Sequence, residues 1–261
     1  MGDHARDDES GVTLPMAPSE AEWARMTALD RMRVAASLPA DLGLLPSEGT
    51  PHSNAIRRVH NVLDDHFSRR GRAVFIAENL AVYYPAEPVF APDILAVVDV
   101  GLHDRMKWLV SEEGRGLDLA LEVLVSGDRR KDLELNVERY AQLGIREYFV
   151  FDYTRVRLLG YRLAGGRRYE SIVPQFGMLR SEVLGLELRV QGGRLRFYNG
   201  PEMLAEADER IAVLEQMLAS VDERLRDEAA QREREARTLA EAEAKLAEAL
   251  AEIERLRGQT T

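Results

Sequence analysis

The chain has 261 residues, of which 45% are hydrophobic and 31% charged, with a formal net charge of −10 and no cysteine. This length allows one sizeable core with an appendage. The lack of cysteine excludes disulfides and thiolate metal sites. The acidity argues against a protein that coats nucleic acid, although it leaves room for a local basic groove.

The N-terminal part is expected to contain a tail and two helices. Residues 1–20 mix Asp, Gly, Pro and Ser without periodicity, which predicts a disordered tail. The tail lacks the apolar segment of a signal peptide, and no apolar run in the chain approaches the ~20 residues of a membrane span, so we expect a cytoplasmic protein without a membrane segment. A short helix is predicted within residues 20–38, and a longer one from a cap at Ser53 or Asn54 to a stop at Gly71.

A series of short strands follows. Apolar runs predict strands at residues 73–76, 80–84, 94–100, 117–125 and 147–151. The stretch between the third and fourth strands is expected to be a loop, in which Trp108 either contacts substrate or covers the sheet edge. Between the last two strands, apolar residues at helical spacing predict a helix. Strand, helix and strand at this spacing form a crossover unit, so we expect a parallel pair in the sheet.

Two hairpins with glycine turns complete the predicted core. They join residues 157–163 to 169–173, and residues 186–190 to 195–198. The fold class is therefore α/β, with a mixed central sheet flanked by helices, in a domain expected to span residues 21–200.

The composition changes beyond residue 200, where Ala, Glu, Arg and Leu dominate and no Gly occurs until Gly258. One heptad register runs without a slip, apolar at both ends and polar in the middle, through Ile211, Leu214, Leu218, Val221, Leu225, Glu228, Arg232, Glu235, Leu239, Ala242, Leu246, Ala249, Ile253 and Leu256. This persistence predicts a coiled coil over residues 201–257 that joins two copies into a homodimer through residues 211–256. A solvated single helix is the alternative, and residues 258–261 read as a tail.

Two carboxylates lie inside predicted strands. Asp93 precedes an aliphatic run, and Glu122 is surrounded by Leu121 and Val123 in another. Burying a carboxylate costs free energy unless its desolvation is compensated. Two such groups on neighbouring strands would repel each other, and a divalent cation between them is the simplest remedy.

The order of these motifs resembles the PD-(D/E)xK nuclease core, and more closely the Uma2-type restriction endonuclease family (DUF820). The resemblance rests on Pro92-Asp93, the strand Leu119–Ser126, the helix and strand from Tyr140 to Asp152, the strand Leu158–Tyr161 and the segment Glu182–Leu186. It covers about residues 50–200 and implies a Mg²⁺-dependent phosphodiesterase site, with Mn²⁺ as an alternative ion. By this resemblance Asp93, Glu122 and the main-chain carbonyl of Val123 would ligate the metal.

The chain departs from the family pattern at the catalytic lysine. The third residue of the second half-motif is Leu124, and the helix position about one turn after Asp132, where relatives often carry Lys, holds Asn136. Asn can bond a phosphate or a water, but it supplies no positive charge to a transition state. Lys131 and Arg130 are near in sequence, and Arg139 lies one helical turn beyond Asn136. Lys131 could reach inward to supply this charge, or it could be solvated.

Two acids, Glu78 and Asp132, are further candidates, as residues acting from outside the metal's ligand shell. Glu78 could equally be a surface residue at a strand end. Arginine clusters at residues 57–58, 69–72 and 129–131 could line a DNA groove or could serve solubility.

Two functions remain open on the sequence. The first is a dimeric Mg²⁺-dependent endonuclease that hydrolyses nucleic acid, with DNA as the expected substrate. The second is a catalytically impaired nuclease fold that binds nucleic acid or protein and assembles through its coiled coil. Retention of both acids favours the first function, and Asn136 favours the second.

Overall fold

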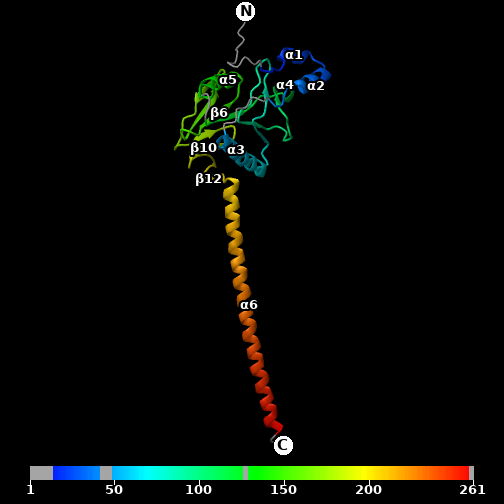
Figure 1. Cartoon of the computed structure of the whole chain (residues 1–261), viewed down its shortest axis with the longest axis vertical. Coiled ribbons are helices and arrows are strands. Elements are labelled where there is room, and N and C mark those ends of the chain that lie inside the picture. The colour runs from blue at the N-terminus through cyan, green and yellow to red at the C-terminus, as the bar shows by residue number, and fades with distance from the viewer. Residues whose placement is uncertain (1–13, 42–48, 126–128, 259–261) are drawn as a thin grey trace, which may run out of the picture. The chain divides into compact units, whose positions relative to one another are not determined.

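The computed structural model describes residues 14–41, 49–125 and 129–258, and the chain divides into two compact units, residues 1–206 and 207–261 (Figure 1). The first unit extends past residue 200 because the short strand β12 (Glu202–Met203) still pairs with β11 (Arg194–Asn199). The second unit contains one helix.

A six-stranded mixed sheet forms the centre of the first unit. Its spatial order is β1 (Val74–Glu78), β3 (Ile94–Val98), β5 (Leu119–Leu124), β6 (Glu147–Asp152), β7 (Arg157–Ala164) and β8 (Arg168–Ser171). β5 and β6 are parallel, and every other neighbouring pair in this sheet is antiparallel. The predicted parallel pair is confirmed. Its crossover contains a π-helical turn, η1 (Lys131–Leu135), that continues into α5 (Asn136–Gln142).

Apolar side chains alternate between the two faces of this sheet. On one face they pack against the long helix α3 (Gly49–Arg70) and a four-stranded antiparallel sheet of β12, β11, β10 (Leu186–Gln191) and β9 (Leu179–Ser181). On the other face they pack against α5 and the buried Trp108. Both predicted hairpins, β7–β8 and β10–β11, are present. The expected α/β class, with a mixed sheet between helices, is confirmed.

The N-terminal elements differ from the prediction. The single helix expected within residues 20–38 is two helices, α1 (Glu20–Arg25) and α2 (Ala28–Ser37), because Ser19 and Thr27 each form a capping box. Residues 14–19, expected to belong to a disordered tail, include Ala17, which is buried and bridges to Pro85. Residues 1–13 lie outside the described part of the chain.

Two further boundaries were wrong. α3 begins at Gly49, before the cap expected at Ser53 or Asn54, and it ends at Arg70 with Gly71 in a left-handed conformation, as expected. The expected loop after β3 contains β4 (Trp108–Leu109), which pairs in parallel with β2 (Val82–Tyr83), and α4 (Val110–Glu113). Trp108 is fully buried and its indole N–H donates to the carbonyl of Arg115 at 3.0 Å, so it covers the sheet and is not a mobile contact.

The second unit is the continuous helix α6 (Ala207–Gly258) of 52 residues. A straight helix of this length extends about 78 Å. Within the described residues, no helix is both long and apolar enough to cross a membrane.

Candidate active site

Two buried carboxylates lie together where β3 begins and β5 nears its end. Asp93 directly precedes β3, and the antiparallel register pairs Ile94 with Leu121, which makes Glu122 its neighbour. The backbone N–H of Asp93 donates to Oε2 of Glu122 at 3.2 Å, and the N–H of Val123 donates to Oδ2 of Asp93 at 2.7 Å. Asp93 is 9% exposed and Glu122 5% exposed. The two acids predicted on neighbouring strands are therefore in contact.

The environment of Glu122 disfavours its charged form. Burial raises the pKa of the Glu122 carboxyl well above its usual range, and the negative charges of Asp93 and Asp132 raise this pKa further. The positive charge of Lys131 and a hydrogen bond from Tyr140 lower the pKa of Glu122 but do not outweigh burial. A positive ion placed beside these acids would reverse the balance.

Tyr140 holds the second oxygen of Glu122. Its hydroxyl donates to Oε1 of Glu122 at 2.9 Å from the buried face of α5, and the pKa of Tyr140 is itself raised well above 10 by burial first and by Glu122 second. The sequence did not predict a role for this tyrosine at the site. Its hydroxyl was the signal, because a buried tyrosine hydroxyl usually has a hydrogen-bond partner.

His52 also reaches the site, although no role was predicted for it from the sequence. It lies in the first turns of α3, and its Nε2 is 3.0 Å from Oδ2 of Asp93, a residue 41 positions away in the chain. No sequence spacing indicates such a contact, since only the packing of α3 against the sheet creates it. Oδ2 of Asp93 thus contacts both His52 and the N–H of Val123.

The helix after β5 brings the remaining candidates near. Asn136 is buried and its Nδ2 donates to Oδ1 of Asp132 at 3.1 Å. Its backbone N–H donates to the carbonyl of Lys131 and closes the π-helical turn. Such turns are rare in proteins, and those that occur are often found at functional sites. Lys131 is exposed at the start of this turn, yet its charge is near enough to lower the pKa of Glu122. Residues 126–128, which precede this helix, lie outside the described part of the chain.

Glu78 lies at the end of β1, beside the start of β3. It pairs in register with Ile94, the residue after Asp93, and its Oε1 is 3.6 Å from Nδ1 of His60. Its side chain is 34% exposed, so it is partly accessible to solvent at the strand end.

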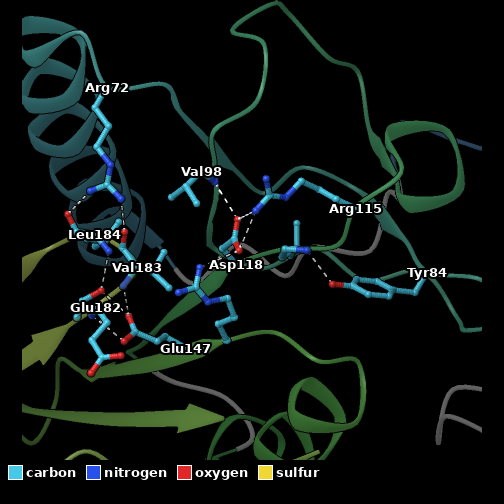
Figure 2. Close-up of polar contacts among 12 residues, drawn as sticks. Arg72, Tyr84, Val98, Arg115, Asp118, Glu147, Glu182, Val183 and Leu184 are labelled. Carbon is cyan, nitrogen blue, oxygen red and sulfur yellow. Dashed lines mark hydrogen bonds and ion pairs between the residues drawn. The ribbon is translucent and has the colours of Figure 1, made fainter.

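Several arginines of the predicted basic clusters bind the protein itself. Arg129 donates to buried Asp152 at 2.6 Å, and Arg72 donates to the carbonyls of Val183 and Leu184, both at 2.7 Å (Figure 2). These side chains therefore stabilise the fold, which removes part of the basic surface that the sequence suggested.

A second pair of buried acids shows how this fold compensates a structural carboxylate (Figure 2). Asp118 and Glu147 lie at the opposite end of β5 and β6 from Glu122. Asp118 accepts from Arg115 at 2.9 Å and lies 3.4 Å from Arg146, and Glu147 accepts from Arg162 at 2.9 Å. Each of these two acids thus has a guanidinium partner.

Asp93 and Glu122 lack such compensation. Within the described residues neither forms an ion pair with Lys or Arg, and the side chain that contacts Asp93 is the imidazole of His52. The described part of the chain also has no group of three or more His, Asp or Glu side chains arranged to hold a metal. The side chains that could hold an ion here are therefore the two carboxylates.

Replacing Tyr140 with Phe removes the donor to Glu122 and keeps the ring. We expect the free energy of unfolding of the metal-free protein to fall by about 1–3 kcal/mol, because a buried acceptor loses its partner. Denaturant unfolding measures this change. Tyr161→Phe is the matched control, since the Tyr161 ring stacks on Tyr148 but its hydroxyl has no hydrogen bond among the described residues. Equal losses in the two variants would contradict the role of the Tyr140 hydroxyl.

Comparisons with known proteins identify the family. A family model described as "Uma2: Putative restriction endonuclease" matches residues 41–191. Among solved structures, the chain is similar to a protein from Anabaena variabilis ATCC 29413, described as "a putative nuclease belonging to DUF820", with 14% identity and a TM-score of 0.45 over 56% of this chain and 80% of that chain. No curated protein matches. Because the matched region spans more than half of the chain and contains both Asp93 and Glu122, this protein belongs to the Uma2 family.

Proposed function

We propose that this protein is a nuclease that hydrolyses phosphodiester bonds in nucleic acid with a divalent metal ion, and that its substrate is DNA. Membership in a family described as a restriction endonuclease supports nuclease function and nucleic-acid binding. The observation that carries the finer proposal is the buried pair Asp93 and Glu122, whose carboxylates have no Lys or Arg partner among the described residues. A structural role alone does not explain keeping two acids in these surroundings.

The residues present fit a hard cation. Asp93, Glu122 and the main-chain carbonyl of Val123 would hold Mg²⁺, or Mn²⁺ in its place, because such ions prefer oxygen ligands. When bound, the ion would polarise the scissile phosphate and lower the pKa of an attacking water.

The protein supplies the positioning. The N–H of Val123 and His52 fix Oδ2 of Asp93, and Tyr140 fixes Oε1 of Glu122. These bonds orient the two carboxylates before any ligand arrives, which avoids reorganisation during the reaction. Lys131 would supply positive charge to the transition state, and Asp132 with Asn136 would orient a water or a phosphate oxygen. Glu78 would act from outside the ligand shell.

A second function is favoured by one observation. Asn136 occupies the helix position where relatives are expected to carry Lys, and its amide is already bonded to Asp132. A chain without a catalytic cation would bind nucleic acid or protein without cutting, and it would assemble through α6. We rank this function second because the two buried acids remain in place.

Two expectations of the sequence remain part of the proposal. The exposed apolar seam of α6 supports a homodimer through residues 211–256. A cytoplasmic location stays a prediction.

The proposed metal site predicts a specific loss on replacing Asp93 with Ala. We expect Mg²⁺ and Mn²⁺ to bind the wild type in a calorimetric titration and the variant at least tenfold more weakly, with metal-dependent nicking of supercoiled DNA lost in parallel. Asp64→Ala, which removes an exposed carboxylate from α3, is the matched control and should bind and nick like the wild type. Absence of metal binding in all three proteins would leave the second function.

The proposed role of Lys131 predicts a rescue. Lys131→Ala should lower the nicking rate by about 100-fold or more while the variant still binds the metal, because one stabilising charge is lost from the transition state. Asn136→Lys in the same chain should restore part of this rate by returning a cation to the helix. Arg130→Ala, an equally exposed neighbour, is the control. Unchanged nicking in Lys131→Ala would contradict the role.

A further inference from the structure

The seam of α6 is an exposed surface with apolar residues at both ends and charged residues in the middle. We define the seam as the residues in the two inward heptad positions from Leu214 to Ile253. Its apolar members are strongly exposed, for example Leu218 at 66% and Leu246 at 62%. Between its apolar ends lie three charged members, Glu228, Arg232 and Glu235. A partner must cover the apolar residues and also accommodate these charges.

A parallel pair of α6 helices would place identical residues opposite each other. Glu228 would face Glu228 of the second copy, and Arg232 and Glu235 would likewise face their own copies. Three consecutive layers of like charge would then lie in the middle of the interface, and like charges brought together in this way oppose association. The central charges therefore act against the parallel orientation.

An antiparallel pair with full overlap changes every one of these contacts. Reversing one helix places each residue in the first inward position against the second inward position of the other helix. With the ends aligned, Arg232 faces Glu235 of the second copy, and Glu235 faces Arg232 of the second copy. The two central layers become ion pairs, and Glu228 faces Leu239 instead of another glutamate.

The apolar layers also match in this alignment. Leu214 faces Ile253, Leu218 faces Ala249, Val221 faces Leu246, and Leu225 faces Ala242 of the second copy. Two of these layers combine a large with a small side chain, which fills space evenly between close helices. In a parallel pair, Ala242 and Ala249 would instead face their own copies and leave gaps. The flanking positions offer exposed pairs of opposite charge in either orientation, and such pairs contribute little.

We propose that α6 forms an antiparallel homodimer in which the seams of two copies overlap completely, with reciprocal Arg232–Glu235 pairs at its centre. The proposal rests on the dimer proposed above and adds its orientation and register. The two N-terminal ends of the helix pair would lie roughly 80 Å apart.

Cysteine cross-linking of the full chain tests this orientation directly, because the native chain contains no cysteine. Leu225→Cys and Ala242→Cys are made as single variants, and purified chains are mixed and mildly oxidised. We expect covalent dimers only in the mixture, since residues 225 and 242 of opposite chains meet, whereas two copies of residue 225 lie about 25 Å apart, beyond the reach of a disulfide. Cross-linking of Leu225→Cys alone would indicate a parallel pair and overturn the proposal.

Charge reversal gives an independent readout. Arg232→Glu should weaken the dimer at least tenfold in sedimentation or light scattering, and the double variant Arg232→Glu/Glu235→Arg should recover within about threefold of the wild type. Arg232→Glu also removes the pair with Glu228 in its own helix, which weakens either orientation, so the recovery in the double variant separates the two. An unchanged dissociation constant in the single variant, or a double variant that binds no more tightly than the single one, would overturn the orientation. A monomeric wild type would overturn the dimer as well. Neither result affects the nuclease proposal, which is tested by metal binding and nicking.

Discussion

The burial of Asp93 beside Glu122 is the constraint on which the rest of this site depends. Taking two carboxylates out of water costs several kcal/mol for each ion in a real protein unless other groups compensate. The fold supplies hydrogen bonds from Val123 and Tyr140, but among the described residues no lysine or arginine pairs with either acid. The two carboxylates therefore have hydrogen-bond partners but, in the described part of the chain, no Lys or Arg ion-pair partner. A bound cation is the simplest way to offset their negative charge.

The same sheet shows that this incompleteness is local. At the other end of β5 and β6, Asp118 and Glu147 are also buried, and each pairs with at least one arginine. The fold thus compensates buried carboxylates fully where they serve structure. The contrast between the two ends supports the proposal that the Asp93–Glu122 pair binds a ligand, whereas the Asp118–Glu147 pair holds strands together.

Patterns local in sequence predicted much of this fold. The strands around Asp93 and Glu122, the crossover through α5 and both glycine hairpins follow from residue periodicity and turn chemistry, and the contact between the two acids follows from the strand order. The contact of His52 with Asp93 did not, because it depends on how α3 packs on the sheet. The break between α1 and α2 was missed although Thr27 carries a capping signal. The π-helical turn at Lys131 could not be predicted, since its hydrogen-bond pattern leaves no residue signature.

The most direct test of the account is the stability of Glu122→Gln against the wild type, measured by denaturant unfolding across pH with and without Mg²⁺. Because the pKa of Glu122 is raised in the folded protein, its contribution to stability is present below pH ~4.5 and is lost as pH rises through the folded pKa. Without metal, the account predicts a wild type that loses stability relative to Glu122→Gln as pH rises, and with Mg²⁺ it predicts that the wild type alone is stabilised. A variant that is less stable than the wild type at pH 8 without metal, combined with no effect of Mg²⁺ on either protein, would contradict it.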